Sequence, residues 1–231
     1  MQDKTKDLIA YEDDDVIVVL KPPGLAVETK KIGEEDLVSL LRKYQKAENG
    51  GRSDFSPAPI NRLDQPVSGL VLFAKNRTAA AKLSEGLRDG DFTKVYRAAV
   101  SGSFEEKKGK LVSRLYKDAK TNTSKAVKPG DALYDKAKEA ILEYEEMNPG
   151  EVIIRLYTGR HHQIRVQLSE AGHPILGDFK YGNASSIEEA KTKGITRLML
   201  TAIELSFPHP STKKRMTFTV NEDNTVTQKE T

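Results

Sequence analysis

Two five-residue apolar runs, at residues 16–20 and 70–74, constrain the fold of this 231-residue chain most strongly. The second run is continuous and has the length of a strand, which is typical of a buried central strand. The first run is followed by Lys21-Pro22-Pro23-Gly24. These residues must end it, because proline donates no hydrogen bond to a strand ladder and Pro-Gly favours a turn. The chain is therefore expected to contain a β-sheet.

Helical patterns alternate with these strands. Leu37, Leu40 and Leu41 have the i, i+3, i+4 spacing of an amphipathic helix at residues 36–44. Asp36 is well placed to cap the N-terminus of that helix. Residues 78–87 are rich in alanine and predict a second helix, with Gly90 just beyond its end.

The other expected elements follow no regular order along the chain. We expect a third helix at 161–170, a loop at 48–59, and further strands at 94–100, 142–144, 152–157 and 198–207. Neither an internal repeat nor a regular βαβ spacing connects them. This pattern favours an α+β fold in one domain over residues 1–231, with a mixed, largely antiparallel sheet flanked by helices around a central cleft.

The composition, with 37% hydrophobic and 31% charged residues, is that of a soluble globular protein. The absence of cysteine excludes disulfides, iron–sulfur clusters and cysteine nucleophiles. No apolar run approaches the roughly 20 residues that a membrane span needs. The N-terminus also lacks the apolar core of a signal peptide. We therefore expect a cytoplasmic protein.

The charge is distributed unevenly, although the net charge is only +3. Residues 105–128 carry eight Lys and Arg against three Asp and Glu, and residues 131–151 carry two against seven. A polarised surface with a basic patch is the electrostatic footprint of a nucleic-acid-binding protein. Two solvated faces without a partner explain the same pattern, so charge alone leaves both interpretations open.

A candidate catalytic carboxylate precedes the buried strand. The segment 61–69 contains Arg62-Leu63-Asp64 and ends in Ser68-Gly69. Loops at the edge of a rigid sheet are where catalytic groups tend to lie. By spacing alone, an Asp that merely caps a turn is the favoured interpretation.

A second polar cluster lies at the expected start of the third helix. Arg160, His161, His162, Gln163 and Arg165 follow Thr-Gly, and a helix N-terminus with arginines can bind an anion. Neighbouring residues of a helix point about 100° apart, so the two histidines are not expected to share a metal ion.

An aromatic residue lies between basic ones on the strand expected at 94–100. Lys94, Tyr96 and Ala98 share one face of that strand. A tyrosine in such a place can stack on a nucleic-acid base, or it can be an ordinary core aromatic.

Taken together, these motifs resemble the RluA family of RNA pseudouridine synthases in order and spacing, from about residue 8 to residue 210. The residues that carry the resemblance are Lys21-Pro22-Pro23-Gly24; Arg62-Leu63-Asp64 with Ser68-Gly69-Leu70 and Ala74-Lys75; Lys94-Val95-Tyr96-Arg97-Ala98; Thr158-Gly159-Arg160-His161-His162-Gln163-Ile164-Arg165; Gly172-His173-Pro174-Ile175-Leu176-Gly177-Asp178 with Tyr181-Gly182; and Leu205-Ser206-Phe207-Pro208-His209-Pro210. One such motif would be weak evidence, whereas six in order are specific.

The resemblance implies a catalytic domain of the pseudouridine-synthase type that isomerises uridine within RNA, without a cofactor or metal. Asp64 matches the family's catalytic aspartate, and Arg165 matches the arginine expected to pair with it. Tyr96 is expected to stack on the target base and to serve in proton transfer at C5. We therefore expect these three side chains to face one another in a groove.

The resemblance also implies RNA contacts. Arg62 is expected either to fill the space left by a flipped uridine or to form a structural salt bridge. Lys21, Arg160, His161 and Gln163 are further candidate RNA contacts. The basic residues at 107–128 are expected to grip phosphates as a mobile flap. The expected partner is ribosomal or transfer RNA, bound by a monomer, with neither DNA nor a membrane involved.

The sequence departs from the family pattern beside the catalytic position. Asn61 stands where histidine is usual, Gln65 and Val67 replace a usual polar residue and threonine, and Gln167 replaces a common histidine. These changes affect the expected RNA positioning more than the chemistry. We also expect no S4-type RNA-binding domain before the catalytic domain. The alternative hypotheses are an RNA-binding or chaperone homologue that has lost turnover at the altered Asn61 loop, and, more remotely, a carboxylate-dependent hydrolase.

Overall fold

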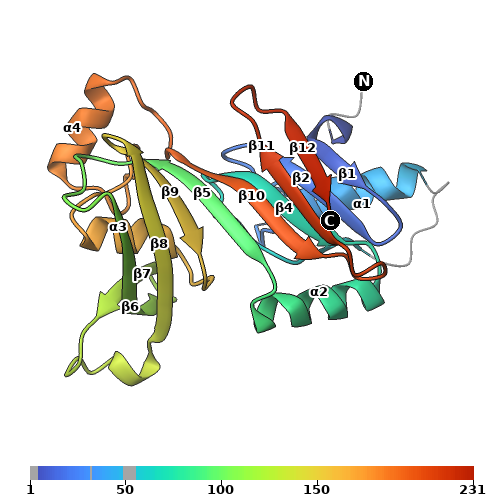
Figure 1. The fold of residues 1–231 in the computed structure, drawn as a ribbon, viewed down its shortest axis with the longest axis horizontal. Helices are drawn as coiled ribbons and strands as arrows, with labels where there is room; N and C mark the ends of the chain where they lie inside the picture. Colours follow the sequence, from blue (N-terminus) through green and yellow to red (C-terminus); the bar gives the residue numbers. More distant parts are fainter. Residues whose placement is uncertain (1–4, 32, 49–55) are drawn as a thin grey trace. The chain divides into compact units, whose positions relative to one another are not determined.

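The computed structural model describes residues 5–31, 33–48 and 56–231. The chain forms two compact units: Met1–Thr93 with Ala202–Thr231, and Lys94–Thr201 (Figure 1). The first unit thus joins two segments that are distant in the sequence. Within the described ranges, no helix has the length and apolarity to cross a membrane.

The sheet of the first unit is built around the two apolar runs. Its strands are β1 (Ile9–Glu12), β2 (Val16–Lys21), β3 (Ala58–Pro59), β4 (Ser68–Ala74), β10 (Leu200–Pro208), β11 (Arg215–Val220) and β12 (Val226–Glu230). Antiparallel β2 and β4 pair with Val18 opposite Leu72, and both side chains are fully buried. The other edge of β4 meets β10, which pairs in turn with β11. The prediction of a buried central strand is confirmed.

Two capped helices complete the first unit, after the short 3-10 helix η1 (Lys6–Leu8). Helix α1 (Leu37–Glu48) starts at Asp36, whose Oδ1 accepts the Ser39 N–H at 2.7 Å. Helix α2 (Arg77–Asp89) is followed by Gly90, whose φ of 89° is the left-handed conformation of a helix C-cap. Leu83 of α2 joins the core that includes Phe207 and other residues of β10 and β11. Both predicted helices and both caps are confirmed.

The second unit contains a meandering sheet with helices. Its elements are β5 (Thr93–Ala99), β6 (Lys108–Asp118), β7 (Thr123–Val127), the 3-10 helix η2 (Tyr134–Lys136), β8 (Lys138–Asn148), β9 (Glu151–Leu156), α3 (Gln163–Glu170) and α4 (Ala184–Thr192). The strand order is β5-β9-β8-β6-β7, with antiparallel pairing at each step. Val166 of α3 packs against Leu115 and Ala140 of this sheet.

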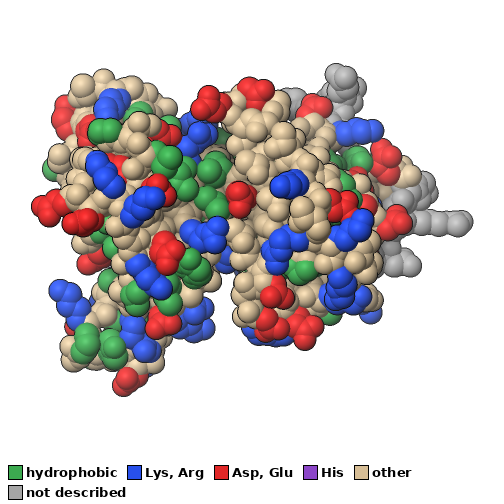
Figure 2. All heavy atoms as spheres, in the orientation of Figure 1, with side chains coloured by type: hydrophobic (Ala, Val, Ile, Leu, Met, Phe, Trp, Pro, Cys, Tyr) green, Lys and Arg blue, Asp and Glu red, His purple; other side chains and the backbone are tan. Residues whose placement is uncertain are grey.

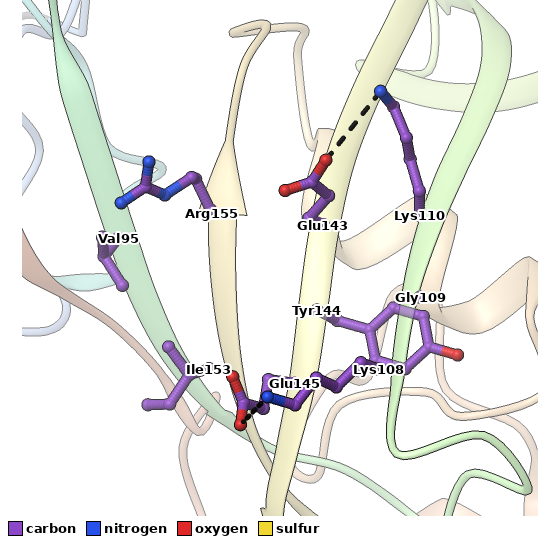
Figure 3. Close-up of a pocket in the computed structure, with 9 residues that line it drawn as sticks. All are labelled: Val95, Lys108, Gly109, Lys110, Glu143, Tyr144, Glu145, Ile153 and Arg155. Carbon is purple, nitrogen blue, oxygen red and sulfur yellow. Dashed lines mark ion pairs between the residues drawn. The ribbon is translucent and has the colours of Figure 1, made fainter.

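The basic and acidic segments pair with each other in this sheet. Strand β6 runs antiparallel to β8, so Lys108 lies opposite Glu145 and Lys110 opposite Glu143. Figure 3 shows the two resulting ion pairs, with N–O distances of 2.8 Å and 3.9 Å. Figure 2 likewise shows basic and acidic side chains intermixed on the face in view. The charge separation along the sequence therefore does not become a separation in space at this end of β6.

A shallow groove of about 580 Å³ runs over the same strands, between these ion pairs and Val95, Ile153 and Arg155 (Figure 3). Val95 neighbours Tyr96 on β5, and successive side chains of a strand point to opposite faces. The groove therefore lies on the face of β5 that Tyr96 does not occupy.

The α+β fold with a largely antiparallel sheet is confirmed. The prediction omitted β1, β6, β7, β11, β12 and α4, and it started the third helix two residues before Gln163. The expected loop at 48–59 contains the short strand β3 at its end, and its residues 49–55 lie outside the described part. A single domain with a central cleft stays a prediction.

Candidate active site

The loop that carries Asp64 is fastened to β4 by a buried asparagine. Asn61 donates its Nδ2 to the Leu70 carbonyl at 3.1 Å, and its Oδ1 accepts the Leu72 N–H at 2.8 Å. The Ile60 N–H also bonds the Leu72 carbonyl, at 2.8 Å. The residue that departs from the family pattern thus acts here as an extension of the sheet, and its side chain is turned inward.

A fully buried lysine fixes the same loop from the other side. The Nζ of Lys21 donates to the carbonyls of Pro22, Leu25 and Gln65 at 2.9, 2.7 and 3.0 Å. Burial lowers the pKa of Lys21 to about 8, and the nearby charge of Asp64 opposes that shift. Since the attraction is mutual, the Lys21 ammonium favours the carboxylate form of Asp64. A contact between Lys21 and RNA stays a prediction, and it would require these bonds to break.

A glycine allows the loop to enter β4 beside β10. Gly69 has a φ of 120°, which L side chains rarely adopt. A Cβ at this position would lie 2.3 Å from the Ala202 carbonyl oxygen. The glycine of the Ser-Gly pair that follows the aspartate motif is therefore required by the close approach of the two strands.

Arg62 is exposed and forms a weak ion pair with Glu28. Its Nη2 lies 3.1 Å from Glu28 Oε2, and the side chains are 70% and 48% exposed. Such a pair contributes about 0–1 kcal/mol to stability. A salt bridge is therefore present, and it is weak enough to be exchanged for another partner.

Arg165 is held by a buried acid that was not predicted as its partner. Its Nε and Nη2 donate to the two carboxylate oxygens of Asp178 at 2.7 and 2.8 Å, and the side chains are 7% and 1% exposed. The guanidinium also lies 5.0 Å from the centre of the Tyr181 ring. The Gly-Asp and Tyr-Gly motifs were the sequence signal for these two residues, but spacing alone assigned them no role.

The two histidines lie before α3, where the backbone has not yet become helical. His162 has a left-handed φ of 55°, so its ring stacks on that of His161 with centroids 3.7 Å apart. The prediction that the two histidine side chains point about 100° apart, which assumed a helix at this position, is therefore wrong. Within the described ranges, no group of three His, Asp or Glu side chains is placed to hold a metal ion.

Both histidine rings connect the turn to the β6–β7 hairpin. His161 Nδ1 lies 2.9 Å from Ser124 Oγ, and His162 Nδ1 lies 2.6 Å from the Tyr181 hydroxyl. That hydroxyl also accepts the Ser124 N–H at 2.8 Å. Burial, followed by nearby positive charges, lowers the pKa of His161 to about 4 and that of His162 to about 3. Both rings are therefore neutral near pH 7.

Gln163 and Arg160 shape the turn. Gln163 is buried, and its Oε1 accepts bonds from the Thr158 hydroxyl and the Arg160 N–H at 2.8 and 3.0 Å. Its Nε2 donates to the Ile141 carbonyl at 3.1 Å. The Arg160 side chain is exposed and donates to the Glu139 carbonyl at 2.7 Å. The predicted RNA contact of Gln163 stays a prediction, and it would compete with these internal bonds.

Tyr96 is buried on β5, opposite Ile154 of β9. Lys94 lies two residues earlier, on the same face by strand alternation. Burial lowers the pKa of Lys94, and the charge of Arg160 lowers it further. Asp64 belongs to the first unit, whereas Tyr96 and Arg165 belong to the second. That the three face one another therefore stays a prediction.

Comparison with known proteins places these motifs in a family. The family model for RNA pseudouridylate synthase matches residues 15–170. The chain is 31% identical to an uncharacterized RNA pseudouridine synthase of Bacillus subtilis, YhcT, over 88% of its own length. It is 34% identical to ribosomal large subunit pseudouridine synthase C of Escherichia coli, over 91% of its length. The chain spans 65% of the length of each of these two relatives.

Solved structures show the same fold. Human RNA Pseudouridylate Synthase Domain Containing 4 matches with a TM-score of 0.74 at 22% identity, over 94% of this chain and 90% of that one. Human RNA Pseudouridylate Synthase Domain Containing 1 matches with a TM-score of 0.69 at 23% identity, over 96% of this chain and 82% of that one. With the family model covering most of the chain, the resemblance to the RluA family is confirmed, and the protein belongs to the RNA pseudouridylate synthase family.

Proposed function

We propose that this protein isomerises uridine to pseudouridine within RNA, with Asp64 as its catalytic carboxylate. The support is its membership of the family, together with the way the chain prepares both charged groups of the expected site. Lys21 and Asn61 fix the loop of Asp64 from two sides. Asp178 fixes the guanidinium of Arg165. Groups held in this way need little reorganisation when substrate binds.

The proposed reaction needs no co-reactant. The bond between N1 and C1′ breaks, and a bond between C5 and C1′ forms after the uracil turns over. C5 loses a proton and N1 gains one, so atoms and electrons balance. Asp64 acts either as a nucleophile or by stabilising the positive charge that develops at the sugar. Tyr96 is proposed to receive or relay the C5 proton, and Arg165 to orient the carboxylate.

The observation that carries the proposal is the internal anchoring of the Asp64 loop. The Lys21 ammonium donates to the Gln65 carbonyl of this loop and to the Pro22 and Leu25 carbonyls of the turn after β2, and the Asn61 amide holds the loop to β4. A homologue that only bound RNA would need no such anchoring of this loop. The alternative hypothesis attributed lost turnover to Asn61, but that side chain supports the loop instead.

The test is Asp64→Asn with Asp14→Asn as its matched control, since Asp14 is an exposed aspartate in the same unit. The substrate is large-subunit ribosomal RNA transcribed in vitro with uridine tritiated at C5, and release of tritium into water measures turnover. We expect Asp64→Asn to abolish release while RNA affinity stays within about tenfold. Asp14→Asn should behave as the unaltered chain. Substantial turnover by Asp64→Asn would refute the assignment.

Ribosomal RNA is the substrate class we propose, because the Escherichia coli relative is named a ribosomal large subunit enzyme. Transfer RNA transcripts serve as the comparison in the same assay. We further propose that the chain acts as a cytoplasmic monomer whose partner is RNA and neither DNA nor a membrane. Binding of RNA without tritium release from either transcript would favour the RNA-binding alternative.

A further inference from the structure

The loop that holds Arg165 also presents an aromatic ring to solvent. Phe179 is 67% exposed, more than any other large hydrophobic side chain among the described residues. It lies between the buried Asp178 and the lysine that precedes Tyr181. A phenylalanine buried in a core contributes about 1.5–3 kcal/mol to folding stability. The exposed ring of Phe179 does not make this contribution, so packing within the chain does not explain a phenylalanine at this position.

The backbone around Phe179 is held by several hydrogen bonds. Asp178 Oδ1 accepts the N–H groups of Lys180 and Tyr181 at 3.0 and 3.1 Å. The Asp178 carbonyl accepts the Gly182 N–H at 2.8 Å, and Ser169 Oγ donates to the Tyr181 carbonyl at 2.6 Å. A ring on such a loop loses little conformational entropy when a partner covers it.

The surroundings of this loop are positively charged. The Nζ of Lys180 donates to the Asn122 carbonyl, in the turn between β6 and β7, at 2.8 Å. The charges of Lys117, Lys180 and Arg165 each lower the pKa of the nearby His161. Three cations, one of them the residue next to Phe179, thus lie near His161.

We propose that Phe179 is a stacking platform for an RNA base, next to phosphate contacts made by Lys180 and the β6–β7 turn. An exposed aromatic among cations is the arrangement with which proteins bind single-stranded nucleic acid, because every base offers a π-face and every nucleotide a phosphate. The inference rests on the proposed function and adds a binding residue outside the catalytic groups. A base beside the target uridine is the expected occupant, because unpaired bases are the ones free to stack.

The experiment compares Phe179→Ala, Phe179→Trp and the control Met147→Ala, with Met147 chosen because it is 57% exposed in the same unit. Affinity is measured by filter binding on in-vitro-transcribed large-subunit ribosomal RNA. We expect Phe179→Ala to weaken binding by about 5- to 160-fold, the range that corresponds to one stacked base. Phe179→Trp should restore binding, and Met147→Ala should leave it unchanged. In turnover, Phe179→Ala should raise KM with little change in kcat, because the ring touches no reacting atom.

Three results would overturn the inference. One is equal RNA affinity for Phe179→Ala and the unaltered chain. Another is a loss of affinity that Phe179→Trp does not restore. The third is an oligomer of this chain, detected by sedimentation, that Phe179→Ala dissociates without changing RNA affinity. That result would mean that the ring contacts a second copy of the protein and not RNA. Tritium release by the unaltered chain tests the proposed function separately, so the two ideas can fail independently.

Discussion

Removing the carboxylate that holds Arg165 should damage both stability and turnover. Asp178 and Arg165 form two charge-assisted bonds of 2.7 and 2.8 Å with almost no exposure to water. Asp178→Ala leaves the guanidinium buried without its counter-charge, which costs about 3–5 kcal/mol in free energy of unfolding. Asp178→Asn keeps one acceptor oxygen, so its cost should be nearer 1–3 kcal/mol.

The milder variant separates positioning from folding. For Asp178→Asn, we expect kcat to fall about 100-fold, the effect of displacing a catalytic group by roughly 1 Å, while RNA affinity changes little. Urea denaturation gives the stability change at constant m, and tritium release gives kcat. Asp135→Asn, an exposed site in the same unit, is the control and should alter neither.

A double-mutant cycle with Arg165→Met tests why Asp178→Asn lowers stability. Because the cost of Asp178→Asn comes from a buried guanidinium that has lost the Asp178 carboxylate, Asp178→Asn should cost less when Arg165 is already replaced. If Asp178→Asn kept its full kcat, or if the two substitutions were additive in stability, the reasoning would be refuted.

Two further predictions concern charge in the two units. Lys21→Met should reduce kcat more than RNA affinity, because the Gln65 carbonyl of the Asp64 loop and the Pro22 and Leu25 carbonyls of the turn after β2 lose their shared donor. An unchanged kcat with weaker, less salt-dependent RNA binding would show instead that Lys21 contacts phosphate. The free energy of unfolding should fall as the pH drops from about 6.5 toward 4. In this range His161 and His162 become protonated in the unfolded chain, whereas in the folded chain their pKa values are about 4 and about 3 and they stay neutral. The His162 contribution to the slope of the free energy of unfolding is about 1 kcal/mol per pH unit. Urea titrations at several pH values should therefore show a flatter dependence of this free energy on pH for His162→Gln than for the unaltered chain. An equally steep dependence would contradict the lowered pKa of His162.

The elements that the sequence predicted are those whose signals are local. The apolar runs of β2 and β4, the leucine spacing of α1, and the caps at Asp36 and Gly90 each lie within a few residues of the structure they determine. The β6–β7 hairpin was missed because its first strand alternates lysines with few apolar residues. Its pairing depends on Glu143 and Glu145 of β8, more than thirty residues later.

The same distinction between local signals and distant contacts applies to the candidate site. The motif order located Asp64, Tyr96 and Arg165 as residues, but their supports come from other parts of the chain. Asp178 lies on a loop beyond α3, and sequence spacing does not show that it turns back onto Arg165. The start of α3 was placed too early because Ser124 and Tyr181 fix the histidine turn, and neither contact has a local signature.

The first unit is closed by strands that lie at both ends of the chain, and this sets an order of events during synthesis. When Thr93 has emerged from the ribosome, the edge of β4 that will receive β10 is still bare, and Phe207 and Phe218 are absent from the core. At 5–20 residues per second, translating the intervening Lys94–Thr201 takes roughly 5–20 s. The nascent segment up to Thr93 must therefore wait with an open apolar edge, whereas the contiguous second unit has all its strands once Thr201 has been made.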